Sequence, residues 1–270
     1  MNELVIERLS PSDIPSNLQL SQSVGWPDTE AEWRVIHEAA LVLGARRAGQ
    51  LIGQGALGLY EGAGSIAKMV VSPDTRRQGV GAAILDGLLT EAKSRSLPVV
   101  GLVATALGRP LYESRGFQPL GGVCILMGTP RCDEALTVAR PVDDAERILA
   151  IERHFNGSAR AAVLRGRLRD SNATALLAGG FALATAHEMG ARLGPVLADT
   201  EETARMLTMS IFRALGGPVR VDVPAERSEF RAWLQGLGLV EKGVNVEMAR
   251  GGKLPWNVPE RFALATQAWG

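Results

Sequence analysis

The chain has 270 residues, of which 46% are hydrophobic, and Lys plus Arg equals Asp plus Glu at 29 each. This length predicts two domains with sizeable buried cores. The balanced charge argues against bulk binding to nucleic acid or to a membrane surface, and no apolar run approaches the roughly 20 residues that span a bilayer.

The ends and the rare residue types add further expectations. The charged side chains of Glu3, Glu7 and Arg8 do not fit a signal peptide, so we expect a cytoplasmic protein. Without an export signal, Cys124 and Cys132 are expected to be free thiols rather than a disulfide. The three histidines are scattered without metal-ligand spacing, and we expect no metal site.

Apolar periodicity and turn residues predict a mixed α/β first half. Its expected elements, in chain order, are a strand at 4–8, helices at 18–24 and 29–38, a hairpin at 41–46 and 51–60, a strand at 65–71, a helix at 82–93, a strand at 98–105, a short helix at 111–115 and a strand at 118–127.

The second half repeats this rhythm. Its expected elements are strands at 173–178, 181–187 and 192–198, a helix at 200–215, a strand at 219–223, a helix at 226–237, a strand at 240–249 and a short helix at 259–269. Because Gly128 and Pro130 mark a break, the sequence predicts two domains, residues 1–129 and 130–270, that share one mixed-sheet α/β fold.

The segment 70–81 is the most informative part of the first half. An apolar strand runs into a turn and then a loop with Arg76, Arg77, Gly79 and Gly81, just before an amphipathic helix. Free amides and the dipole at a helix N-terminus favour an anion, and the glycines allow close approach of a polyphosphate. An ordinary solvated turn is the alternative. Neither the Gly-Lys-Ser/Thr ending of a P-loop nor the dinucleotide Gly-x-Gly-x-x-Gly spacing is present.

Two motifs in order carry a family resemblance. Val71-x-Pro73-x-x-Arg76-x-x-Gly79-x-Gly81 resembles the acetyl-CoA loop of the GNAT superfamily of acyltransferases, and Leu111-Tyr112-Glu113-x-x-Gly116-Phe117 resembles its second signature. The resemblance covers residues 1–128. Thr105-x-x-Gly108-x-Pro110, with Gly25-Trp26-Pro27 and the closing Phe262-Ala263-Leu264-Ala265, is similar to a bacterial subgroup whose second half is a degenerate copy.

The resemblance implies two GNAT-like acyl-CoA N-acyltransferase domains in tandem and an acetyltransferase that uses acetyl-CoA as co-substrate. It implies direct attack by a primary amine in a ternary complex, with a strand amide that polarises the thioester carbonyl and Tyr112 as the acid that protonates the CoA thiolate. The implied acetyl-CoA-binding residues are Met69, Val70, Val71, Arg76, Arg77, Gln78, Gly79, Val80, Gly81 and Thr105.

One of these residues has a structural alternative, and two positions depart from the family pattern. Tyr112 is one of only two tyrosines, but an aromatic residue on a short amphipathic helix is usually a core residue. The family commonly has asparagine at the place of Thr105 and alanine at that of Gly108. Thr105 still offers a hydrogen-bonding hydroxyl, so its contacts rather than cofactor binding are in question.

The acceptor side is less well defined. Glu32, His37 and Glu61 are candidates for a general base, each with an alternative reading as a solvated or capping residue, and a water relay is equally open. Trp26 and Trp33 are expected to pack in the core, with an aromatic wall for an apolar amine as the alternative. The acceptor is expected to be a small-molecule or peptide amine; the oligomeric state stays open.

A comparison of the two halves predicts one active centre. An alignment on the Asp74-Thr75 and Asp199-Thr200 pairs places Glu201 and Glu202 opposite Arg76 and Arg77, which would repel the pyrophosphate. At the second signature, Leu234 stands opposite Tyr112. The second domain is then expected to support the first or to complete the acceptor pocket. The alternative for the whole protein is a sensor or structural module that binds acetyl-CoA without turnover.

Overall fold

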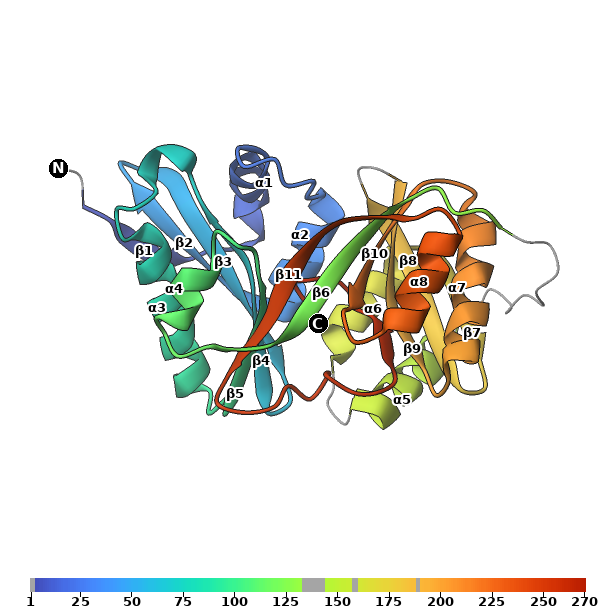
Figure 1. The fold of residues 1–270 in the computed structure, drawn as a ribbon. Coiled ribbons are helices and arrows are strands. Elements are labelled where there is room, and N and C mark those ends of the chain that lie inside the picture. Colours follow the sequence, from blue (N-terminus) through green and yellow to red (C-terminus); the bar gives the residue numbers. More distant parts are fainter. Residues whose placement is uncertain (1–2, 133–143, 157–159, 188–189) are drawn as a thin grey trace.

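The computed structural model describes residues 3–132, 144–156, 160–187 and 190–270. They form two α/β lobes that meet along two long central strands (Figure 1). The first lobe consists of β1 (Val5–Arg8), α1 (Ile14–Gln22), α2 (Glu30–Ala39), β2 (Ala40–Arg47), β3 (Gln50–Tyr60), β4 (Ala63–Val71), α3 (Val80–Ser94), β5 (Val99–Ala104), α4 (Arg109–Glu113) and β6 (Gln118–Gly128).

The second lobe repeats this order. Its elements are α5 (Ala145–Asn156), α6 (Ala161–Arg169), β7 (Ser171–Leu177), β8 (Gly180–His187), β9 (Gly190–Ala198), α7 (Glu201–Leu215), β10 (Val219–Pro224), α8 (Ser228–Gly236), β11 (Val240–Arg250) and β12 (Arg261–Ala263). The mixed-sheet α/β architecture with two copies of one fold is confirmed.

Two differences from the expected elements have local causes. The helix expected at 259–269 is wrong: the segment is the short strand β12, which pairs with β9, followed by turns. All of residues 261–266 are buried, and a segment buried on every side has no polar helical face. Helices α5 and α6 were not expected, although Ile148, Leu149, Val163 and Leu164 show the i, i+1 apolar pairs of amphipathic helices.

The last strand of each half pairs with the other half. Within the described residues, the main path of the sheet runs β1-β2-β3-β4-β5-β11-β6-β10-β9-β8-β7. Strand β11 pairs antiparallel with β5, from Val246 opposite Ala104 to Arg250 opposite Val100. Strand β6 pairs antiparallel with β10, so a sequence boundary at residues 129 and 130 does not divide the sheet.

Each lobe has a core beneath its long helix. In the first lobe Ile84, Leu85 and Leu88 of α3 are fully buried against the sheet, and in the second Leu207 and Phe212 of α7 are buried in the same way. On the other face, a cluster joins α1 and α2 to the end of the chain through residues that include Trp33, Trp256 and Trp269. The first lobe is therefore completed by residues from the second half of the sequence.

Candidate active site

Strands β4 and β5 diverge in the middle of the first lobe. Their parallel pairing runs only from Ala63 opposite Val99 to Ile66 opposite Leu102, although β4 continues to Val71. The divergence follows a bulge, because Gln54 pairs with Val70 and Ala56 with Ala67, and Lys68 has a positive φ of 53°. Met69, Val70 and Val71 therefore lie on the part of β4 that β5 does not pair, where an extended ligand can add to the strand.

The loop between β4 and α3 presents backbone amides at its surface. Arg76, Arg77, Gln78 and Gly79 are exposed, and Gly79 caps α3 in the left-handed region with a φ of 82°. The first bond of the helix runs from the Ala83 amide to the Gly79 carbonyl, so the amides of residues 80–82 precede it.

Positive charge surrounds these amides without neutralising partners. Arg47 donates to the Gln78 amide oxygen at 2.7 Å, and no ion pair within the described residues involves Arg76 or Arg77. Val80 is buried, and a Cβ on Gly81 would lie 3.4 Å from Val71. Free amides at a helix N-terminus with positive charge beside them favour an anion.

Helix α4 places Tyr112 at the end of the same sheet. Tyr112 is 7% exposed and packs edge-on against Phe117, with ring centroids 6.0 Å apart. Met69, Val71 and Leu111 pack against the same cluster. Burial raises the pKa of the phenol above its ordinary value, so Tyr112 stays protonated at neutral pH and retains the proton that an acid must donate.

The positions that depart from the family pattern lie against this tyrosine. Thr105 is exposed, and its hydroxyl accepts from the Gly108 amide at 3.2 Å. A Cβ on Gly108 would lie 3.1 Å from the Tyr112 ring, which is tighter than ordinary contact. Glycine at 108 therefore lets the tyrosine ring pack closely against this turn.

The structure separates the three candidates for a general base. Glu61 is exposed in the turn between β3 and β4, at the opposite end of β4 from the bulge. His37 contacts Asn17 at 3.0 Å, and burial lowers its pKa although Asp13 opposes that shift. Glu32 accepts from the Thr29 amide in a capping box at the start of α2.

The carboxylate of Glu32 interacts with positive charges from both lobes. Burial opposes its ionisation, but Lys68, Arg192 and the Thr29 amide, together with Arg167, outweigh burial and lower its pKa. Trp33 is fully buried in the core, and Trp26 is partly buried against the same cluster. The packing role expected for both tryptophans fits these positions.

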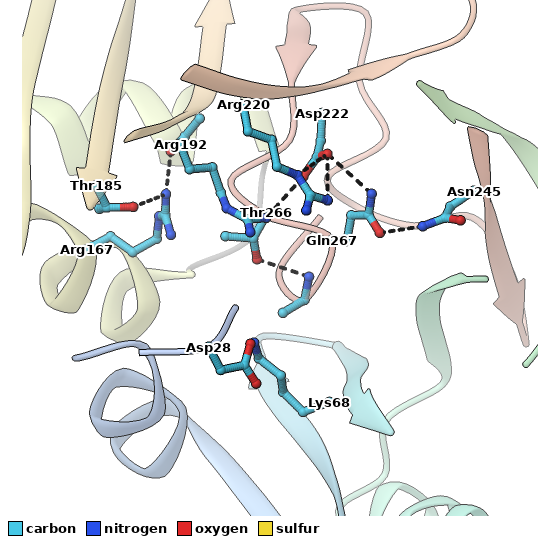
Figure 2. Close-up of polar contacts among 12 residues, drawn as sticks. Asp28, Lys68, Arg167, Thr185, Arg192, Arg220, Asp222, Asn245, Thr266 and Gln267 are labelled. Carbon is cyan, nitrogen blue, oxygen red and sulfur yellow. Dashed lines mark hydrogen bonds and ion pairs between the residues drawn. The ribbon is translucent and has the colours of Figure 1, made fainter. Parts of the chain in front are cut away.

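Between the lobes lies a polar cluster that the sequence did not reveal (Figure 2). Lys68 of the bulge pairs with Asp28 at 2.5 Å. From the second lobe, Asp222 of β10 accepts from Arg192 at 3.2 Å and from Arg220 at 3.0 Å. The cluster continues to the described C-terminal residues, because Gln267 donates to Asp222 and accepts from Asn245 of β11.

The second lobe lacks the anion loop altogether. Eight residues, 72–79, separate β4 from α3, but β9 ends at Ala198 and α7 begins at Glu201. The alignment on the Asp-Thr pairs is therefore wrong at this point: Glu201 and Glu202 lie in the first helical turn and correspond to Val80 and Gly81 rather than to Arg76 and Arg77. The Thr200 hydroxyl accepts a hydrogen bond from the Thr203 amide, so one of the free amides at this helix N-terminus already has a partner.

The counterpart of Tyr112 agrees with the alignment. The Phe117 amide donates to the Tyr112 carbonyl, and the Leu239 amide donates to the Leu234 carbonyl in the same geometry. Both turns use a glycine with positive φ, Gly116 and Gly238. Leu234 is fully buried and carries no proton to donate, so the second lobe keeps the turn without the phenol.

Two further observations concern the described residues only. They contain no group of three or more His, Cys, Asp or Glu side chains arranged to hold a metal ion. No helix among them is long and apolar enough to cross a membrane.

The candidate site thus combines a splayed and bulged strand, a loop with free amides at a helix N-terminus, and a buried phenol. Comparison with protein families gives the class of protein: residues 26–129 match one model described as an acetyltransferase (GNAT) domain, and residues 148–261 match a second. The chain belongs to the GNAT superfamily of N-acetyltransferases and carries two GNAT domains in tandem.

Related proteins share this whole-chain organisation. The chain is 24% identical to the uncharacterized N-acetyltransferase YitH of Bacillus subtilis, over 100% of this chain and 99% of the relative. Its fold is similar to a crystal structure of a proposed acetyltransferase from Pyrococcus horikoshii, with a TM-score of 0.87, 18% identity and coverage of 99% and 96%. A tandem GNAT protein from the clavulanic acid biosynthesis pathway has a TM-score of 0.66, 14% identity and coverage of 93% and 99%.

As a GNAT enzyme, the protein transfers an acyl group from an acyl-CoA to an amine. Acyl-CoA is its co-substrate.

Proposed function

We propose that the protein transfers the acetyl group of acetyl-CoA to a primary amine at one centre, in the first lobe. The observation that carries this proposal is that three features lie together where β4 and β5 diverge. These are the stretch Met69–Val71 that β5 does not pair, the free amides that begin α3, and the buried phenol of Tyr112. The second lobe has no anion loop and no counterpart of the phenol.

In this proposal the pantetheine arm adds to β4 as a further strand, and the pyrophosphate binds the amides of residues 76–81. Arg76 and Arg77 contribute positive charge, Gln78 lines the loop, and Thr105 lies near the arm beside Tyr112. A backbone amide at Met69 or Val70 donates to the thioester carbonyl, where negative charge develops in the transition state. These assignments rest on the exposed loop and on the unpaired part of β4.

The chemical step is direct attack in a ternary complex. The neutral amine nitrogen bonds to the carbonyl carbon, the carbon–sulfur bond breaks, and Tyr112 protonates the departing thiolate. The proton that the amine loses leaves through water in this proposal. Glu61 lies at the far end of β4, His37 is held by Asn17, and the lowered pKa of Glu32 makes it a weak base.

We also propose residues 1–129 and 130–270 as the two domains. This division follows the repeat in the sequence and agrees with the matched ranges 26–129 and 148–261. The exchanged strands β6 and β11 then belong by sequence to one domain and by pairing to the other.

Replacement of Tyr112 by phenylalanine tests the reaction. With a panel of amines, amino acids, polyamines and peptides, wild-type protein should release CoA thiol, and Tyr112→Phe should lower kcat about 100-fold or more while acetyl-CoA affinity is kept. Tyr60→Phe is the matched control, because the Tyr60 hydroxyl donates to the Trp269 carbonyl at 3.3 Å, in the core beside the chain end.

Two outcomes would contradict the proposal. If Tyr112→Phe turns over like wild type, the phenol is not the acid. If wild-type protein binds acetyl-CoA but releases no thiol with any acceptor, the protein is a sensor rather than an acetyltransferase.

A further inference from the structure

Arg167 is buried between the lobes and forms no ion pair with a carboxylate among the residues that the structure describes. It is 4% exposed, and one of its terminal nitrogens donates to the Gly194 carbonyl at 2.7 Å and to the Thr185 hydroxyl at 3.3 Å. Burial lowers its pKa, and the neighbouring Arg192 adds to that shift. A buried guanidinium with neutral partners only is costly unless an anion completes the site.

Two buried donors remain unused in this cluster. Neither the Nε of Arg167 nor the Nε of Arg192 has a hydrogen-bond acceptor among the described residues. Arg192 is 8% exposed, and its terminal nitrogen shares Asp222 with Arg220. A buried donor without an acceptor destabilises the fold, so a purely structural role leaves these two donors unexplained.

The charges of the cluster favour one added negative charge. Its cations are Lys68, Arg167, Arg192 and Arg220, and its anions are Asp28, Glu32 and Asp222. Counted over the described residues of the cluster, the cations exceed the anions by one. A guanidinium fork matches the two oxygens of a carboxylate, and a carboxylate supplies a single negative charge.

The cluster also adjoins the reacting part of β4. Lys68 is the bulge residue that precedes Met69, and the charge of Glu32 interacts with Lys68 as well as with Arg167 and Arg192. Figure 2 shows the Asp28–Lys68 pair on one side and the arginines of the second lobe on the other. Solvent reaches the group, since the side chains of Lys68, Arg192 and Arg220 are 13%, 10% and 16% exposed.

We propose that Arg167 and Arg192 form a subsite for a carboxylate of the acceptor, so that the enzyme acetylates a primary amine that also carries a carboxylate. The inference rests on the proposed function and adds the acceptor class. It also gives the second lobe a role in acceptor specificity: Arg167 lies on α6 and Arg192 on β9, whereas the thioester site belongs to the first lobe.

Matched acceptors test the subsite. The panel pairs β-alanine with n-propylamine, 4-aminobutyrate with n-butylamine, and glycine, alanine and glutamate with their α-amides; O-phosphoethanolamine probes a phosphate in place of the carboxylate. We expect wild-type protein to prefer the carboxylate member of at least one pair by tenfold or more in kcat/KM.

Arg167→Gln removes the positive charge without leaving a buried anion unpaired, because the Thr185 hydroxyl and the Gly194 carbonyl, to which Arg167 donates, are neutral. It should raise KM for the preferred carboxylate acceptor tenfold or more, leave the rate with the neutral analogue unchanged, and keep acetyl-CoA affinity. Arg167→Lys should recover part of the loss. Arg165→Gln is the control, since Arg165 lies on the same helix but is exposed and pairs with Glu146.

A binding readout separates this inference from the proposed function. In the presence of CoA, the preferred carboxylate amine should raise the melting temperature of wild-type protein, and Arg167→Gln should abolish that shift even if no turnover occurs. Equal effects of Arg167→Gln on charged and neutral acceptors, a wild-type preference for neutral amines, or dominance of O-phosphoethanolamine would overturn the carboxylate subsite.

Discussion

His37 and His187 link the stability of the fold to pH. Burial lowers the pKa of His37, and burial with Arg192 and Arg220 nearby lowers that of His187 to about 4, from an ordinary value of 6.5. A histidine with a depressed pKa in the folded state contributes stability that is fully present above about pH 6.5 and is lost as pH falls. Protonation therefore favours the unfolded chain.

We expect the free energy of unfolding to decrease by about 1 kcal/mol between pH 6.5 and 5, a value reduced for solvent screening. The carboxylates with lowered pKa, Asp13, Glu32 and Asp86, have ordinary values of 3.8 to 4.5 and contribute only at lower pH. Urea unfolding of a His37→Gln, His187→Gln variant should show a flatter profile from pH 6.5 to 5; the wild-type slope in that variant would contradict this origin.

Some residues of the candidate site could be recognised from the sequence, and others could not. Tyr112 and the loop arginines were identified because they stand within motifs of fixed spacing. Lys68 and Arg167 were not, since the bulge depends on how β3 pairs with β4, and the arginines approach it from residues far along the chain. No local pattern predicts such a meeting.

The start of α3 is the element on which cofactor binding depends. Gly79→Glu places a carboxylate beside the free amides, where it competes with the pyrophosphate, and should weaken acetyl-CoA binding at least about tenfold. Calorimetric titration measures this loss.

Gly62→Glu is the matched control for that variant. Gly62 and Gly79 both have positive φ, 73° and 82°, and an added Cβ meets nothing within 4 Å at either position. Both variants should lose about 1–2 kcal/mol of stability from the left-handed backbone, but only Gly79→Glu should lose binding. If Gly79→Glu and Gly62→Glu bind acetyl-CoA with equal affinity, the loop before α3 is not part of the binding site.

The exchange of β6 and β11 is testable by cross-linking. Val100 of β5 lies opposite Arg250 of β11, so a Val100→Cys, Arg250→Cys protein in a background without Cys124 and Cys132 should form an intramolecular disulfide. Peptide mapping under non-reducing conditions detects it. A second protein with a cysteine pair between β5 and β6 is the comparison. If the β5–β11 pair forms no disulfide and the β5–β6 pair forms one, the strands are not exchanged.

Most helices and strands were predictable because capping residues and apolar periodicity are local. Thr29 and Thr200 cap α2 and α7 as their sequences suggest. The segment 259–269 was mistaken for a helix because its burial comes from both lobes, and strand exchange was not predictable because either half offers β5 a last strand of similar composition.

In the whole molecule, the two copies of the fold contribute different parts of the candidate site. The first lobe holds the part of β4 that β5 does not pair, the glycine-containing loop and the phenol, whereas only two residues separate β9 from α7. The second lobe instead sends Arg167, Arg192 and Arg220 toward the bulge, and β11 completes the sheet of the first. We therefore propose one catalytic centre per chain.

Calorimetric titration of the wild-type chain with acetyl-CoA tests that proposal most directly. We predict a stoichiometry of one acetyl-CoA per chain, with binding lost in Gly79→Glu and retained in Gly62→Glu. A stoichiometry of two, or a single site that survives Gly79→Glu, would show that the second lobe binds the cofactor and would contradict the account.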